Sequence, residues 1–111
     1  QAFVRDYVAA FKTVPVSSAG STYRAALFLK AAIERAKSVE PTAVAAAFKD
    51  LTIETPMGRD TMRGKDHEVI SGVMVLGRTA PDRAYPHWTF TDLQTVAGTE
   101  AAVPEAEVKA C

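Results

Sequence analysis

The most apolar stretch of the chain, residues 22–36, predicts a helix with apolar side chains on nearly every side. It is rich in Ala and Leu, which favour helix, and it contains no Gly or Pro. A surface helix usually shows a single apolar stripe, whereas a helix that is apolar all round is buried. We therefore expect a largely buried helix over residues 21–37. Charge interrupts the apolar pattern only at Arg24, Lys30, Glu34 and Arg35.

Two shorter segments also show helical spacing. Residues 2–12 place an aromatic and aliphatic face at intervals of three and four, and Pro15 ends that helix. A third helix is expected over residues 41–51, because Pro41 suits the first helical position, where its missing N–H costs nothing. The faces that define these two helices are Phe3, Val4, Tyr7, Val8 and Phe11 in the first, and Val44, Phe48 and Leu51 in the second.

The second half of the chain predicts strands, at residues 59–63, 67–78 and 87–96. The middle strand has apolar residues on both faces, and Gly72 within it indicates a bulge or a close approach of another backbone segment. Residues 98–111 offer little to pack and are expected to form an extended tail. The two apolar faces of the middle strand are Val69, Val73 and Val75 on one side and Ile70, Met74 and Leu76 on the other.

These elements predict an α+β unit over residues 1–97, in which three helices precede a small antiparallel β-meander. The apolar helix and the two-faced strand both require more covering surface than the chain supplies. Large exposed apolar patches usually mark an interface. We therefore expect a second copy of the chain, or sequence absent from it, to cover this surface.

Charge and length exclude several classes of protein. The 111 residues carry 13 basic and 13 acidic side chains, and this balance lacks the basic footprint of a nucleic-acid-binding protein. No apolar run reaches the 18 residues or so that a transmembrane helix requires. The first residues have neither an initiator Met nor the features of a signal peptide, so we expect the chain to begin inside a longer or processed protein.

The candidate metal ligands are poorly placed for a metal ion. Asp66, His67 and Glu68 are consecutive, and His87 is the remaining histidine. Successive side chains of a strand point to opposite faces, and a structural zinc site draws on four converging ligands. We expect a solvated turn here and no metal site. The sequence also lacks a nucleophile elbow, a phosphate loop and a dinucleotide fingerprint, so no catalytic residue or cofactor is predicted.

Two other groups of residues leave alternatives open. Arg59 and Arg63 flank a tight turn, where they either bind a carboxylate ligand or pair with a nearby Asp60 or Asp66. Aromatic residues such as Tyr23 and Trp88 either stack on a ligand or lie in the core. The lone Cys111 is either an unpaired thiol or one half of a disulfide.

Taken together, several stretches of the sequence resemble type I periplasmic binding proteins. The closest group is the leucine/isoleucine/valine-binding, or extracellular ligand-binding receptor, family of ABC-transporter solute-binding proteins. The chain departs from that pattern at Arg24, Lys37 and Glu68, where many members have Asp, Gly and Gln. The stretches that carry the resemblance are FVRDYVAAFK, Tyr23-Arg24-Ala25, the helix from Glu40 to Phe48, Thr55-Pro56-Met57-Gly58, Thr61-Met62-Arg63 and Asp66-His67-Glu68.

The resemblance implies that the chain is the C-terminal part of a two-lobed α/β protein. Such a protein is exported to the periplasm, is not an enzyme, and closes around a solute before docking to a membrane permease. The solute would be a branched-chain or other amino acid, an amide, urea or an aromatic acid. Ser18 and Tyr23 would lie near the hinge and the ligand, and Cys111 would pair with a cysteine in the missing sequence.

Two other functions compete with this interpretation. One is a stand-alone interaction or dimerisation module with no small-molecule ligand, and the other is a small enzyme that uses His67 or His87.

Overall fold

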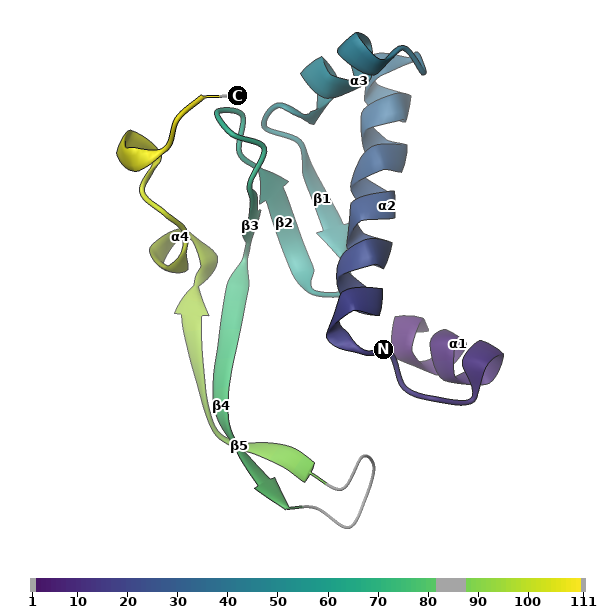
Figure 1. The fold of residues 1–111 in the computed structure, drawn as a ribbon, viewed down its shortest axis with the longest axis vertical. Helices are drawn as coiled ribbons and strands as arrows, with labels where there is room; N and C mark the ends of the chain where they lie inside the picture. The colour runs from purple at the N-terminus through teal and green to yellow at the C-terminus, as the bar shows by residue number, and fades with distance from the viewer. Residues whose placement is uncertain (1, 82–87, 111) are drawn as a thin grey trace.

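The computed structural model describes residues 2–81 and 88–110 of the chain, as a mixed α/β fold with helices and antiparallel sheets (Figure 1). Their bounds are α1 Ala2–Phe11, α2 Ser17–Ala36, α3 Pro41–Phe48, β1 Thr52–Thr55, β2 Gly58–Met62, β3 Val69–Ser71, β4 Val73–Pro81, β5 Trp88–Ala97, α4 Gly98–Ala101 and the 3-10 helix η1 Glu105–Glu107. The three expected helices precede the strands, but the strands form two sheets instead of one β-meander, and α4 and η1 follow them.

The central helix α2 begins earlier than the sequence indicated. Its expected range was 21–37, but the backbone N–H groups of Ala19 and Gly20 already donate to the carbonyl of Val16, at 3.0 and 3.5 Å. The Ser- and Gly-containing connector is therefore part of the first turn. The helix ends where Lys37 adopts a left-handed conformation with φ of 51°, a common way to terminate a helix.

The expected single strand over residues 67–78 is wrong, because the chain changes sheets at Gly72. β3 pairs with β2 in the sheet β1-β2-β3, whereas β4 pairs with β5 in a separate two-stranded sheet. A Cβ atom at Gly72 would lie 2.9 Å from the carbonyl oxygen of Arg59, so only glycine fits there without a shift. The carbonyl of Gly72 also accepts from the N–H of Gly98, at 3.3 Å.

One strand was missed by the sequence analysis, and one expectation about the tail is corrected. The strand that was not predicted is β1. Its short alternating sequence pairs with β2 in antiparallel register, and the hydroxyls of Thr52 and Thr61 lie 2.8 Å apart across the pair. The tail expected to be extended over 98–111 contains α4 and η1. It begins with Gly98, which is buried so close to β3 that a Cβ there would lie 1.5 Å from the carbonyl oxygen of Ser71.

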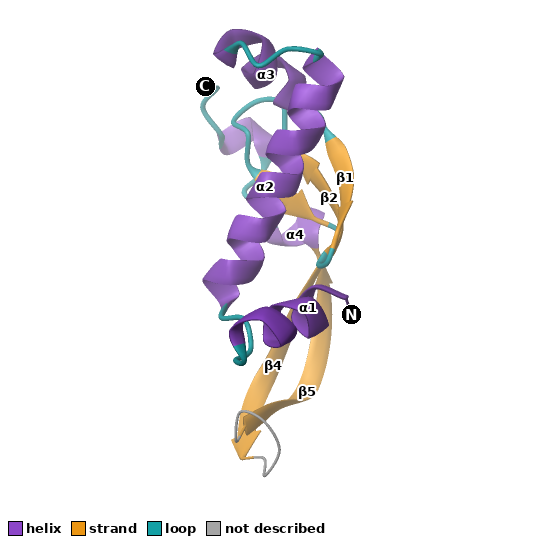
Figure 2. Ribbon diagram, turned by 90° about the vertical axis from the view of Figure 1, so that its right-hand side faces the viewer, coloured by secondary structure: helices purple, strands orange, loops and turns teal. Residues whose placement is uncertain are grey.

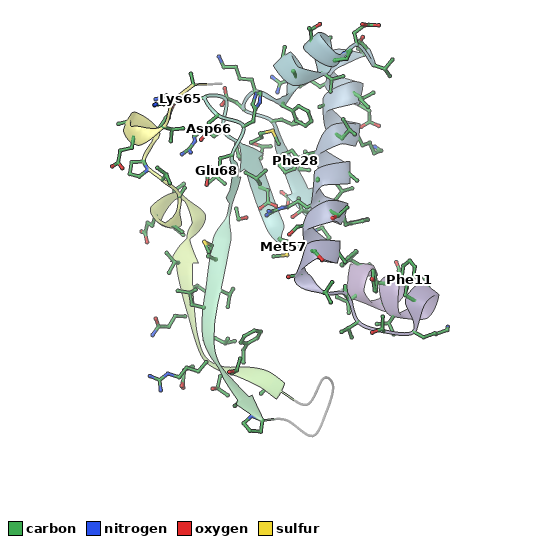
Figure 3. The ribbon with its side chains drawn as sticks, viewed as in Figure 1. Phe11, Phe28, Met57, Lys65, Asp66 and Glu68 are labelled. Atoms are coloured by element: carbon green, nitrogen blue, oxygen red, sulfur yellow. The ribbon has the colours of Figure 1, made fainter. Side chains whose placement is uncertain are left out.

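The core is small and joins α2 to α3 and to the first sheet. Phe28, which is 1% exposed, lies between α2 and the β1-β2-β3 sheet (Figure 3). Ala32 packs with Val44 and Ala47 of α3. The expectation of a largely buried α2 is wrong, because Phe28 and Ala32 are its buried residues and Leu29 is 48% exposed.

The molecule is thin and open for its length. Its extents are 49 × 36 × 17 Å and its radius of gyration is 16.6 Å, whereas a compact domain of this size has a radius of about 13 Å. The β4-β5 hairpin extends away from α2, α3 and the first sheet (Figures 1 and 2). In Figure 2, α2 lies in front of the first sheet and leaves the hairpin uncovered.

Candidate functional site

A largely apolar cavity lies where α1, the first turns of α2 and the turn between β1 and β2 come together. Its volume is about 490 Å³, within the range of small-molecule sites. The β1-β2 turn reaches it because the antiparallel register of Thr55 with Gly58 leaves Pro56 and Met57 as a two-residue loop. The residues around the cavity are Ala2, Phe3, Val4, Pro15, Val16, Ser17, Gly20, Ser21, Tyr23, Arg24, Pro56 and Met57.

Aromatic rings form one wall of this cavity. The rings of Phe3 and Tyr23 have centroids 4.7 Å apart and are tilted by 33°, a separation typical of favourable aromatic pairs. This contact connects α1 to α2. Met57 also lines the cavity, from the tip of the β1-β2 turn (Figure 3), and is 63% exposed. The walls can therefore contact an apolar group with ring faces and a flexible thioether.

Arg24 is the one charged side chain among the described residues that line the cavity. Its Nη1 donates to the hydroxyl of Ser71 at 3.0 Å and lies 3.5 Å from Oδ2 of Asp60. Because Arg24 is in α2 while its partners are in β2 and β3, these contacts attach the helix to the sheet. A guanidinium has five N–H donors, so the contacts leave Arg24 with donors for a further acceptor.

Asp60 is fully buried beneath this arginine. Its Oδ2 also accepts a hydrogen bond from the hydroxyl of Thr55 at 2.9 Å. Its Oδ1 has no hydrogen-bond partner among the described residues. A buried carboxylate depends strongly on its counter-ion, so Arg24 has a structural role in addition to its place in the cavity wall.

The N-terminus of α2 also faces the cavity. Val16 at the N-cap provides no side-chain hydrogen bond, and the first turn of α2 has no acidic residue. The first N–H groups of a helix carry a partial positive charge. Together with Arg24 and the hydroxyls of Ser17 and Ser21, they give the lining of the cavity groups suited to an acceptor group or an anion.

Comparison with known proteins assigns the family. Residues 1–80 match the profile of the family described as Periplasmic binding protein. The chain belongs to the periplasmic binding protein family. Members of this family bind small-molecule solutes, and they are a binding family and not a catalytic one. All of the residues that line the cavity fall within the matched range. A comparison with curated proteins found no match.

Two of the residues predicted from the periplasmic binding protein resemblance, Ser18 and Tyr23, lie beside a common hollow. Tyr23 lines the cavity described above, and together with Ser18 it also lines a neighbouring hollow of about 580 Å³. Cys111 is outside the described residues. Arg24 was noted in the sequence only as a departure from the family pattern, and Phe3 only as part of an amphipathic face, so neither was predicted as a site residue.

The segment around Asp66-His67-Glu68 lies against residues 103–105 of the chain, through Arg63 and Lys65. Arg63 forms two hydrogen bonds to Asp66, at 2.9 and 2.7 Å, and also pairs with Glu68. Its Nη1 donates to the carbonyl of Val103 at 2.6 Å, and Lys65 donates to the carbonyl of Glu105 at 2.6 Å. Figure 3 shows this group beside the tail.

The ion pair changes the titration of both partners. Hydrogen bonds from Arg63 lower the pKa of Asp66 from its ordinary 3.8 to about 2. The same hydrogen bond raises the pKa of Arg63. Of the two alternatives for Arg63, pairing with Asp66 is therefore the one observed, while Arg59 lies 3.9 Å from Glu54.

The hypothesis of a small enzyme relied on His67 or His87, and the structure describes the first of these two residues. His67 is exposed and its ring lies 6.2 Å from that of Phe48, while His87 is outside the described residues. In residues 2–81 and 88–110, no group of three His, Cys, Asp or Glu side chains is placed to hold a metal ion. None of the helices in that part of the chain has the length and apolar character needed to cross a membrane.

Proposed function

We propose that the chain is part of the substrate-binding component of an ABC transporter. In this proposal it captures an amino acid or a related small organic solute and helps to deliver it to a membrane permease. The solute class comprises branched-chain amino acids, amides, urea and aromatic acids. Membership of the family supports a periplasmic location for this protein.

The observation that carries the proposal is a cavity lined by one cation, a helix N-terminus and aromatic side chains. Arg24 and the N-terminus of α2 suit a carboxylate or a carbonyl oxygen, because a guanidinium and a helix N-terminus both favour such acceptors. Phe3, Tyr23 and Met57 suit an apolar body. An apolar acid or amide matches this arrangement better than a sugar or a metal ion, since the lining of the cavity combines a few polar groups with apolar side chains.

The proposed mechanism is closure of two lobes around the solute, a hinge motion. This chain would provide one wall of the cleft, and the N-terminal remainder of the same protein would provide the facing wall. Tyr23 would contact the solute, and Ser18 would lie near the hinge. Cys111 would form a disulfide with a cysteine of that remainder.

Ligand-observed NMR with the 111-residue chain tests this proposal. The probes are L-leucine, benzoate, acetamide and urea. We expect weak binding with a Kd of about 1 mM or higher, because the facing wall is absent. Tyr23→Ala should abolish the signal, whereas Phe90→Ala should leave it unchanged, since Phe90 is 53% exposed on β5 and does not line the cavity.

A double variant separates the role of the cation from its role in folding. Arg24→Gln with Asp60→Asn removes the positive charge without leaving a buried carboxylate unpaired. It should weaken benzoate and L-leucine binding more than acetamide and urea binding, because a carboxylate gains more from the positive charge than a neutral carbonyl oxygen does. Micromolar binding by the chain alone would contradict the two-lobe mechanism. Absence of binding by all four probes would contradict the assignment of the cavity as part of the solute site.

A further inference from the structure

One buried charge lies close to the proposed solute site without lining it. Asp60 of β2 is the buried charged side chain among the described residues, with an exposed fraction of 0%. It is not one of the residues around the cavity, but its ion-pair partner Arg24 is. Aspartate is rarely buried to this extent, because a carboxylate loses its hydration there. The charge of Asp60 is therefore a feature that packing alone does not explain.

The ion pair between Asp60 and Arg24 is loose. Oδ2 of Asp60 lies 3.5 Å from Nη1 of Arg24, and Oδ1 has no hydrogen-bond partner among the described residues. The pair of Arg63 with Asp66 differs, because Arg63 donates to both oxygens of Asp66, at 2.9 and 2.7 Å. Such bidentate pairs are the strong ones, whereas 3.5 Å is beyond the usual range of a hydrogen bond. Arg24 is therefore held less tightly by its carboxylate than Arg63 is.

Arg24 is accessible from the cavity while it contacts Asp60. Its Nη1 donates to the hydroxyl of Ser71 at 3.0 Å and is the same atom that approaches Asp60. A guanidinium has five N–H donors on three nitrogens, and the side chain of Arg24 is 23% exposed. The cation can therefore interact with a solute on one side and with a buried carboxylate on the other.

A solute carboxylate and Asp60 would share this one cation. Charges interact over several ångströms, and more strongly in a partly buried site than in water. Asp60 attracts Arg24 but repels a second carboxylate bound to it, whereas a neutral carbonyl oxygen experiences much less of this repulsion. Asp60 therefore reduces the advantage that Arg24 gives to an anionic solute over a neutral one.

The hydrogen bonds of Asp60 also show how its charge can be removed without disturbing the cavity. Oδ2 accepts from the hydroxyl of Thr55, and the oxygen of that hydroxyl accepts from the N–H of Met57, at 2.9 and 3.0 Å. Asparagine keeps one oxygen to accept from Thr55 and to face Arg24. Its amide nitrogen then takes the place of Oδ1, which has no partner. Asp60→Asn therefore removes the charge and keeps the observed contacts.

We propose that Asp60 is a positioning residue which, acting through Arg24, limits the preference of the site for a carboxylate over a neutral carbonyl group. The inference rests on the solute-binding function proposed above. It narrows the solute class, because a site with this internal counter-ion favours amides and other neutral carbonyl compounds more than Arg24 alone would.

Ligand-observed NMR titrations of the 111-residue chain with benzoate and benzamide test this role. The two probes share one apolar ring and differ in the charge of the polar group. Asp60→Asn should tighten benzoate binding by roughly threefold or more and leave the Kd of benzamide unchanged. The matched control is Asp92→Asn, which removes the same charge from an aspartate of β5 that is 72% exposed and does not line the cavity. The control should bind both probes like the wild type.

The double variant Arg24→Gln with Asp60→Asn completes the experiment. It should reverse the gain in benzoate binding, because the cation through which Asp60 acts is absent. Equal changes for both probes in Asp60→Asn, including a joint loss through unfolding, would show a purely structural role and overturn the proposal.

An unchanged ratio of the two Kd values in Asp60→Asn would also overturn the role of Asp60. The solute-binding function would survive that result, since both probes would still bind. Failure of the wild type to bind either probe would instead contradict the proposed function, and this inference with it.

Discussion

The body of this protein and its two outlying parts, helix α1 and the β4-β5 hairpin, are all rich in apolar residues, but they differ in how many of those residues are buried. The body, formed by α2, α3 and the sheet β1-β2-β3, contains Phe28, Ala32, Val44, Ala47 and Asp60, all buried. In α1 none of the residues is buried, and the described side chains of the β4-β5 hairpin are almost all exposed. Apolar side chains therefore favour burial in both regions. The position of the neighbouring helices and strands decides whether the chain itself can bury them.

The difference follows from chain connectivity. α2 and α3 are joined by a short connection, so their apolar faces meet without a large loss of chain entropy. The hairpin is joined to the body through Gly72 and Gly98 and projects away from the helices (Figure 1). Its partners must therefore come from outside the described residues.

The largest expected difference between the body and α1 is in the folding free energy that is lost when one aromatic side chain of each is replaced by alanine. Phe28→Ala should cost about 3–5 kcal/mol of folding free energy, because it leaves a cavity between α2 and the sheet. Phe11→Ala should change the folding free energy by no more than about 0.5 kcal/mol, since Phe11 is 65% exposed. Urea denaturation of both variants measures the two values, and equal losses would show that α1 belongs to the body.

Gly98→Ala tests how the hairpin is attached. The added methyl group would lie 1.5 Å from the carbonyl oxygen of Ser71, so α4 must shift, at a cost of about 1–3 kcal/mol. Hydrogen exchange should accelerate in β4, β5 and α4 and stay unchanged in α2. The control is Gly20→Ala in α2, where a Cβ meets nothing within 4 Å. Uniform acceleration throughout the chain would contradict a separately attached hairpin.

The smallest expected effect is acid sensitivity at the tail. The pKa of Asp66 falls from 3.8 to about 2 on folding, so its ionised form is bound more favourably in the folded state. This stabilisation is complete above about pH 4 and is lost as the pH falls towards 2. The wild type should therefore lose more stability than Asp66→Asn over that interval. Parallel pH profiles from thermal denaturation would contradict the assignment.

The candidate site was only partly predictable. Tyr23 could be proposed from its place in a family-like motif, and it does line the cavity. Arg24 could not, because its partners Asp60 and Ser71 are 36 and 47 residues away. Ser18 was proposed on the same grounds as Tyr23, but it lines only the neighbouring hollow, which Tyr23 also lines. Neighbouring positions on a helix point in different directions, and the other elements decide which of them meets a cavity.

The sequence by itself determined the three helices, the strand-forming character of the second half and the family, because periodicity and local motifs depend on residues close together in the chain. Only the tertiary structure decided the change of sheet at Gly72, the helical turns after Gly98 and the burial of Asp60 beneath Arg24. These features depend on contacts between distant segments. The uncovered hairpin belongs to this second group, since its exposure reflects which partner elements the described chain places beside it.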